Sequence, residues 1–151
     1  MIIVFDIDDV VADSRHRLHH IRREPRDWVT YYDSLPEDPA ILPVYNIMSD
    51  LGNAGRHKMF LCTGRHEHVR DTTVQWFKDQ GLWRYIKGGL MMRPSNVFCK
   101  NAEAKEIMAK EIVNQEGKID LVFEDNPDSV KMWQRYADLV FEVKYGQAAA
   151  A

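Results

Sequence analysis

The chain has 151 residues, 45% of them hydrophobic and 28% charged, and a formal net charge of −3. This length suits one globular domain with a sizeable core, and the ordinary composition excludes a disordered or fibrous protein. The slightly acidic balance argues against a protein that binds nucleic acid over its whole surface, so any polynucleotide would have to meet a local basic patch.

Apolar runs and helical spacings alternate along the chain. Strands are predicted at 2–6, 57–62, 90–92, 119–123 and 138–143, and helices at 43–54, 66–80, 101–114 and 127–136. Strands that alternate with helices imply a parallel sheet with helices on both faces and right-handed crossovers. We therefore predict one α/β domain over 1–145, a three-layer Rossmann-like fold. A small cap insertion at 13–40, here called the flap, follows the first strand, and 146–151 form a tail outside the fold.

The first strand ends in two carboxylates. Residues 2–5 are apolar without polar alternation, as in a strand covered on both faces, and Asp6 and Asp8 follow directly. Ligands of open α/β sheets bind outside the carboxyl ends of the strands. A buried, unpaired carboxylate is costly, so these side chains need a cation or water. A motif this short also fits a solvated acidic turn.

The flap is locally basic. The side chains that make it basic include Arg15, Arg17, His19, His20, Arg22, Arg23 and Arg26. They could meet a phosphorylated substrate, or they could be the solvated face of a helix that turns Leu18 and Ile21 inward. Trp28, Tyr31 and Tyr32 could stack on a base or pack on the core. The spacing of His16 and His20 suits zinc, but no third ligand lies nearby, which favours surface or phosphate-contacting histidines.

Three later segments also carry residues that can bind a phosphate or a metal. The second strand runs into Thr63, Gly64 and Arg65. Lys105 lies near the start of the 101–114 helix, and Lys100 is the alternative candidate for the lysine of the site. The 119–123 strand ends in the acidic residues Glu124, Asp125 and Asp128. The carboxyl ends of parallel strands meet at one sheet edge, so these side chains are expected to share a site.

These segments, in this order, resemble the four motifs of the haloacid dehalogenase-like phosphohydrolase superfamily. The motifs are Asp6 to Val10, then Thr63 to Arg65, then Lys105, then the pair Glu124 and Asp125. The resemblance narrows to the 3′-phosphatase domains of bacteriophage polynucleotide kinase/phosphatases, through Arg17, Arg65 and the stretch EDNPDSVKMWQR. Asp9 departs from the motif, which most often has glycine there. It could support a metal indirectly, but a solvated side chain is the favoured interpretation.

The resemblance implies a mechanism. Asp6 would attack phosphorus to form an aspartyl-phosphate, and Asp8 would act as the general acid and then the general base. Thr63 would donate a hydrogen bond to a phosphoryl oxygen, and Lys105 would hold that oxygen beside Asp6.

The resemblance also implies the ligands of the site. Mg²⁺ would be held by Asp6, Asp8 through its main-chain carbonyl, and Asp125, helped by Glu124 or Asp128. Arg17, Arg65 and Gly64 would bind the substrate phosphate. Arg65 could instead only pair with acids of the flap.

Two function hypotheses follow. The first is a Mg²⁺-dependent phosphomonoester hydrolase that acts on polynucleotide ends or nucleotides, with 3′-phosphate favoured and a mononucleotide (5′-nucleotidase-like) phosphatase as a variant. The second is a non-catalytic module that binds nucleic-acid ends. The chain has no GxxxxGK[ST] loop, so a kinase partner would be another chain. The absence of a long apolar run or signal peptide, and the distant Cys62 and Cys99, indicate a cytoplasmic protein without a membrane partner.

Overall fold

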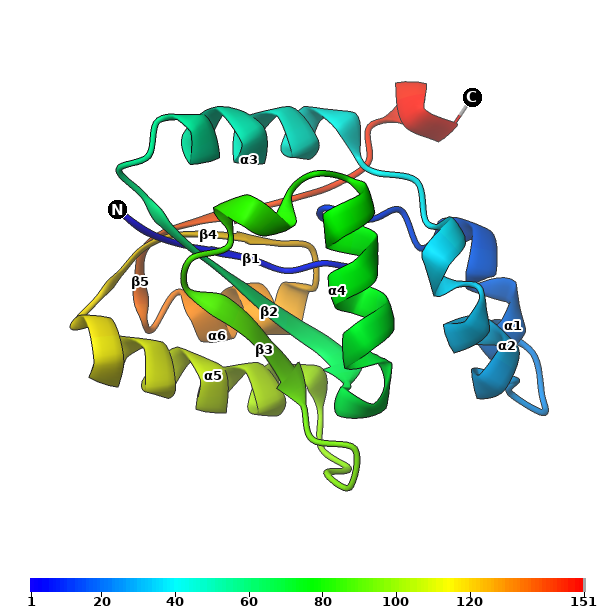
Figure 1. Ribbon diagram of the computed structural model, residues 1–151. Coiled ribbons are helices and arrows are strands. Elements are labelled where there is room, and N and C mark those ends of the chain that lie inside the picture. Colours follow the sequence, from blue (N-terminus) through cyan, green and yellow to red (C-terminus); the bar gives the residue numbers. More distant parts are fainter. Residues whose placement is uncertain (151) are drawn as a thin grey trace.

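Five parallel strands form a single sheet in the computed structural model, which describes residues 1–150 (Figure 1). The strands are β1 (Ile2–Phe5), β2 (Lys58–His66), β3 (Gly89–Arg93), β4 (Ile119–Glu124) and β5 (Ala137–Glu142). Their order across the sheet is β3-β2-β1-β4-β5, so β1 is central and pairs with β2 on one side and β4 on the other. Asp6 therefore leaves the sheet at the middle of its carboxyl edge.

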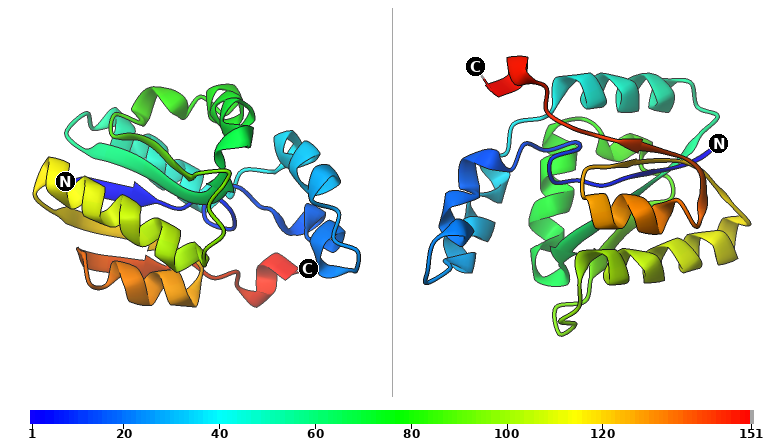
Figure 2. Two further views of the ribbon diagram at one scale, coloured as in Figure 1. Left: turned by 90° about the horizontal axis from the view of Figure 1, so that it is seen from below. Right: turned by 180° about the vertical axis from the view of Figure 1, so that it is seen from behind.

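Helices cover both faces of the sheet (Figures 1 and 2). One layer contains α3 (Leu42–Asn53) and α4 (Arg70–Asp79), and the other contains α5 (Asn101–Glu116) and α6 (Pro127–Trp133). Each face of the sheet has its own hydrophobic core, and successive side chains of a strand enter opposite cores because they point to opposite faces. Thus Ile3 and Phe5 pack in the core of the α3 and α4 layer, whereas Val4 packs with α5 and α6. The predicted three-layer α/β fold is confirmed.

Element boundaries differ most from the predictions in two places, and the helix predicted at 127–136 ends at Trp133. The second strand does not stop at residue 62: it continues to His66, which pairs with Arg93 of β3 after an irregularity in the register. The following helix starts at Arg70, after a 3₁₀ turn at Glu67–Val69, rather than at residue 66. The strand period alone could not show this, because the extension depends on pairing with β3.

Other boundaries follow local rules. Asn126 caps α6 by accepting hydrogen bonds from the backbone N–H groups of Asp128 and Ser129, and Pro127 occupies its first turn. Helix α5 ends at Gly117, whose φ of 80° is a left-handed conformation that favours glycine. In the predicted tail, Gln147–Ala150 form a 3₁₀ turn, and Ala151 lies outside the described residues.

The flap projects beyond the carboxyl end of β1, beside the three layers (Figures 1 and 2). It contains short helices at Arg15–Arg17, α1 (His19–Arg22), α2 (Trp28–Asp33) and Leu35–Glu37. Its two ends are joined by backbone hydrogen bonds, from Asp13 N–H to the Pro39 carbonyl (2.8 Å) and from Ile41 N–H to the Val11 carbonyl (2.8 Å). The flap is therefore fastened at its root. No helix within residues 1–150 combines the length and the apolar character needed to cross a membrane.

Candidate active site

Three carboxylates meet at the carboxyl edge of the sheet. Asp6 follows β1, Glu124 ends β4 and Asp125 comes next, and one oxygen of each lies within 4.8 Å of the others. Lys105, fully buried on α5, places its Nζ 2.9 Å from Asp6 Oδ2 and 2.7 Å from Glu124 Oε2. Burial alone would lower the pKa of Lys105, but the Asp6 and Glu124 carboxylates raise it above its ordinary value. The lysine is thus a permanent cation between two acids.

Both oxygens of Glu124 are already occupied by donors. Oε1 accepts the backbone N–H groups of Asp125 (3.2 Å) and Asn126 (3.1 Å), and Oε2 accepts Lys105 Nζ and Trp133 Nε1 (3.1 Å). Burial opposes ionisation of Glu124, but Lys105 and these donors hold the pKa of its carboxyl below the ordinary value. Glu124 is an ionised residue that fixes the position of Lys105.

The other two carboxylates have less compensation, because Asp6 shares Lys105 with Glu124. Burial, reinforced by the charge of Glu124, raises the pKa of Asp6 well above its ordinary value and that of Asp125 to about 7. One lysine cannot neutralise three acids, so the cluster has a deficit of positive charge. Hard divalent cations such as Mg²⁺ prefer oxygen ligands of this kind, and the donor set fits one. Asp128, the alternative to Glu124, is exposed and lies outside the cluster.

Asp8 is held by two arginines. Its Oδ1 accepts hydrogen bonds from Arg17 Nη2 and Arg65 Nη2, both at 2.7 Å, and its Oδ2 accepts Arg65 Nε at 3.0 Å. Burial opposes ionisation of Asp8, yet Arg65 and then Arg17 lower the pKa of its carboxyl. Both arginines therefore lie beside Asp8. In this structure they pair with its carboxylate, and their predicted role in substrate binding stays a prediction.

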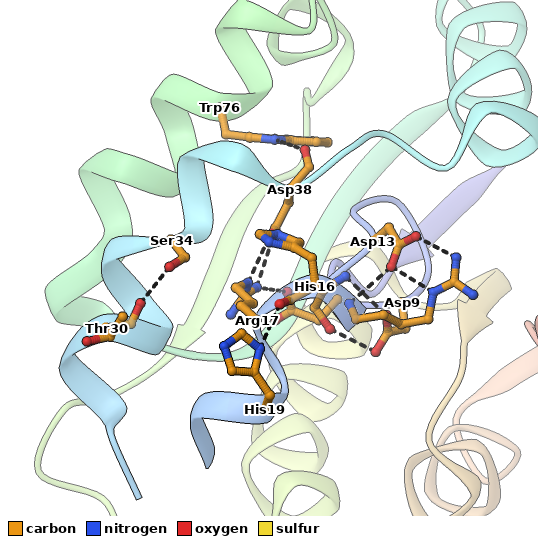
Figure 3. Close-up of polar contacts among 12 residues, drawn as sticks. Asp9, Asp13, His16, Arg17, His19, Thr30, Ser34, Asp38 and Trp76 are labelled. Atoms are coloured by element: carbon orange, nitrogen blue, oxygen red, sulfur yellow. Dashed lines mark hydrogen bonds and ion pairs between the residues drawn. The ribbon is translucent and has the colours of Figure 1, made fainter. Parts of the chain in front are cut away.

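The same two arginines bind a buried flap residue, Asp38, that sequence reasoning did not identify. Figure 3 shows Arg17 beside Asp38. Asp38 accepts hydrogen bonds from Arg17 Nε (2.7 Å) and Nη2 (2.8 Å), and from Arg65 Nη2 at 3.2 Å. His16 Nε2 lies 2.7 Å from the same carboxylate. The contact of Arg65 with Asp38 is the pairing with flap acids that the sequence analysis gave as an alternative. The only sequence signal was an acid placed between Pro36 and Pro39.

The remaining flap cations are not part of this network. Arg17 is fully buried, whereas Arg15, His19, Arg22, Arg23 and Arg26 are exposed. His16 and His20 do not gather a third metal-ligating side chain within residues 1–150. Leu18 and Ile21 are half-buried and line the active-site cleft instead of the core.

Thr63 and Gly64 lie at the end of β2. Thr63 is fully buried, and its hydroxyl oxygen accepts a hydrogen bond from the backbone N–H of Arg65 (3.1 Å). Gly64 lines the cleft, and a Cβ at this position would lie 2.2 Å from Oδ1 of Asn101. A side chain here would therefore collide with the first residue of α5. Lys100, the rival for the lysine role, is exposed at the cleft and does not replace Lys105.

Asp9 is a structural residue of the turn that follows Asp8. Its φ of 60° lies in the left-handed region, and its carboxylate accepts hydrogen bonds from Ser14 N–H (3.2 Å), Ser14 Oγ (2.9 Å) and Tyr145 Oη (3.1 Å). The Arg15 guanidinium lies 3.7 Å above the Tyr145 ring. Asp9 is thus not the merely solvated side chain favoured by the sequence interpretation, and it connects the flap root to the C-terminal segment.

A cleft of about 1050 Å³ joins these groups. Asp6, Asp8 and Asp125 line its inner part, and the flap and the 94–100 loop line the rest. The cleft is far larger than a phosphoryl group and lies at the upper end of the volumes typical of small-molecule sites.

Comparisons with known proteins agree with this site. The sequence matches the family model of the polynucleotide kinase PNKP phosphatase domain over residues 1–147. No curated protein sequence gives a significant match. A chain of a Pnkp1/Rnl/Hen1 complex has the same fold, with a TM-score of 0.66 and 21% identity over 96% of this chain and 46% of that chain.

Two hydrolases also share the fold. The class C acid phosphatase from Bacillus anthracis with tungstate bound has a TM-score of 0.64 and 21% identity, covering 84% of this chain and 52% of that chain. A haloacid dehalogenase-like family hydrolase from Streptococcus pneumoniae has a TM-score of 0.61 and 10% identity, covering 89% and 80%. The present chain spans only about half the length of the Pnkp1 complex and acid phosphatase chains that it matches.

The family match covers nearly the whole chain, and the fold and the gathered acidic and basic side chains agree with it. This favours an enzyme over a non-catalytic binding module. The chain belongs to the polynucleotide kinase PNKP phosphatase domain family, a family of haloacid dehalogenase-like phosphatases.

Proposed function

We propose that the protein removes phosphate, preferably 3′-phosphate, from polynucleotide ends or nucleotides through an aspartyl-phosphate on Asp6, with Mg²⁺ as cofactor. One observation carries the proposal: Asp6, Asp8, Lys105 and Asp125, from three segments of the chain, lie together, with the three aspartates lining one cleft and Lys105 in contact with Asp6. This is the constellation that nucleophilic displacement at a phosphate dianion needs.

Asp6 is the proposed nucleophile. It lines the cleft while Lys105 holds its Oδ2. A carboxylate oxygen of Asp6 bonds to phosphorus as the ester oxygen leaves, so one difficult displacement becomes two easier ones. The Lys105 ammonium stabilises the negative charge on the phosphoryl oxygens, and the Thr63 hydroxyl donates a hydrogen bond to one of them.

Asp8 is the proposed general acid and general base. It protonates the leaving alkoxide in the first step and takes a proton from the attacking water in the second. Arg65 and Arg17, by lowering the pKa of Asp8, favour the ionised form that the second step requires. In our proposal the two arginines and the Gly64 backbone also contact the substrate phosphate.

Asp6, Asp125 and the main-chain carbonyl of Asp8 are the proposed Mg²⁺ ligands, with Glu124 beside them. A bound ion would supply positive charge that offsets the charge of the carboxylates and of the phosphate dianion. The support in this chain is the excess of carboxylates over cations, together with the raised pKa values of Asp6 and Asp125.

The substrate class is supported by the family and by the cleft. The flap has only short helices, so the alcohol half of the substrate can extend from the cleft. A chain of similar fold belongs to a Pnkp1/Rnl/Hen1 complex, which favours a kinase partner on another chain for this protein also. The free Cys62 and Cys99 are compatible with a cytoplasmic setting.

The test is a substrate panel measured as kcat/KM with Mg²⁺ and with excess EDTA. It contains 3′-phosphorylated oligonucleotides, 5′-phosphorylated oligonucleotides, and nucleoside 3′- and 5′-monophosphates. We expect the first to be best and EDTA to abolish turnover. Asp6→Asn should lower kcat by about 10⁴-fold or more. Equal turnover by the asparagine variant would disprove the nucleophile assignment, and a preference for 5′-phosphates would disprove the proposed substrate.

A further inference from the structure

The outer half of the cleft has an aromatic and basic lining that the reaction does not use. We call it the outer cleft and define it by Trp28, Tyr32, His66, His68, Arg93 and Phe98. These side chains come from three places: helix α2 of the flap, the end of β2 with the turn after it, and the 94–100 loop with the end of β3.

Tyr32 is held firmly at the centre of the aromatic group. Its ring is nearly perpendicular to those of His68 (centroids 5.0 Å apart, 82°) and His66 (6.5 Å, 86°), and it stacks against Trp28 at 6.2 Å and 27°. These rings line the same cleft as Asp6 and Asp8. The aromatic group therefore belongs to the cleft in which the proposed reaction takes place.

Two of the outer-cleft rings remain exposed to solvent. Phe98 is 94% exposed and Trp28 45% exposed, although both line the same cleft. Large exposed apolar side chains gathered at a cleft mark a binding surface. Such rings would cover a flat apolar ligand.

Arg93 supplies a positive charge at the same place. Its Nη1 donates to the Cys99 carbonyl (3.0 Å) and its Nη2 to Oδ1 of Asn101 (3.2 Å), and both acceptors are neutral. Among residues 1–150 no carboxylate forms an ion pair with Arg93. Burial and then the Arg93 charge lower the pKa of His66, so at neutral pH the cation is Arg93 and not the histidine. An anion is the missing partner.

We propose that the outer cleft binds the terminal nucleotide of a single-stranded nucleic acid, with its base stacked among Tyr32, Trp28 and Phe98, and the adjoining phosphodiester paired with Arg93. This deepens the proposed function, on which it rests. Aromatic faces combined with a guanidinium are the chemistry that recognises single-stranded nucleic acid with little sequence preference. An oligonucleotide is therefore a better substrate than a mononucleotide, because only it carries the phosphodiester.

The first test concerns the base. For each variant, kcat/KM is measured on a 3′-phosphorylated oligonucleotide and on glycerol phosphate, which has no base, and the ratio of the two is compared. Phe98→Ala should lower this ratio about tenfold, within the range expected for one stacked base. The matched control is Val29→Ala, an exposed residue of α2 that does not line the cleft, and it should leave the ratio unchanged.

The second test concerns the phosphodiester. The ratio of kcat/KM for a 3′-phosphorylated dinucleotide to that for a nucleoside 3′-monophosphate should fall severalfold in Arg93→Gln. Arg93→Lys, which retains the charge, should restore most of it. A purely structural role of Arg93 in the 94–100 loop would instead lower turnover of both substrates equally, in the lysine variant as well.

The outcomes distinguish a failure of the proposed function from a failure of the outer-cleft inference. If the wild-type protein hydrolyses glycerol phosphate but no oligonucleotide, the proposed function is wrong and this inference falls with it. If it hydrolyses oligonucleotides well, but the ratios for Phe98→Ala and Arg93→Gln equal that of the wild type, only the inference is overturned.

Discussion

Replacing Lys105 with methionine tests the electrostatic centre of the site. Lys105→Met keeps an unbranched side chain of nearly the same length but removes a fully buried cation that contacts Asp6 at 2.9 Å and Glu124 at 2.7 Å. Two buried carboxylates lose their partner, and Asp125 lies within 4.8 Å of both. Removing one member of a buried ion pair costs about 3–5 kcal/mol. For a domain of this size that corresponds to a fall in Tm of roughly 6–20 °C.

The loss should depend on pH in a defined direction. Without the ammonium, the native pKa values of Asp6 and Glu124 rise, that of Asp6 further above its value in the unfolded chain, so the native state of the variant binds protons more tightly than that of the wild type. Stability of the variant relative to wild type is then lowest at pH 8 and recovers toward pH 5, where protons replace the lysine. Urea unfolding followed by circular dichroism at both pH values measures this.

Lys110→Met is the matched control, since Lys110 lies on the same helix and forms only an exposed contact with Glu106 at 3.4 Å. It should change stability by less than about 0.5 kcal/mol at either pH. If Lys105→Met unfolded at the wild-type urea concentration at pH 8, the charge balance described for the site would be wrong.

Three further predictions concern other residues of the site. Asp8→Asn should lower kcat for alkyl phosphates by about 10²–10⁴-fold, but much less for an aryl phosphate whose leaving group needs no proton; equal losses would argue against Asp8 as the general acid. Trp133→Phe removes the Nε1 hydrogen bond to ionised Glu124 and should cost about 1.5–3 kcal/mol in urea unfolding, whereas an unchanged midpoint would show that the bond contributes nothing. Because Asp125 has a pKa of about 7, proton loss must accompany cation binding. Mg²⁺ affinity measured by calorimetry should therefore rise between pH 5.5 and about 7, and a flat profile over this range would exclude Asp125 as a ligand. In the metal-free protein the same raised pKa means that this carboxyl lowers stability as pH rises from about 4 to 7.

The sequence predicted the parts of the site that lie at strand ends. Asp6 and Asp125 follow short apolar runs, and parallel strands bring such ends to one edge, so their meeting required no knowledge of side-chain packing. Lys105 was placed by helical spacing near the start of α5, which the structure sets against that edge.

The rest depended on tertiary contacts that no local pattern encodes. Asp38 reaches Arg17 only because the flap ends are fastened together, and Trp133 reaches Glu124 only because α6 packs against β4. The outward extension of β2 to His66 likewise depends on its partner strand β3. Sequence periodicity shows which side chains face inward, but not which polar group each of them meets there.

The pairing of Asp8 with Arg17 and Arg65 has a consequence for turnover. Before a phosphate could bind these guanidinium groups, it would have to displace the Asp8 carboxylate that already pairs with them. Asp8 would therefore compete with the substrate phosphate, as an inhibitor does. The same carboxylate would return when the reaction ends, and so would help to expel the inorganic phosphate product.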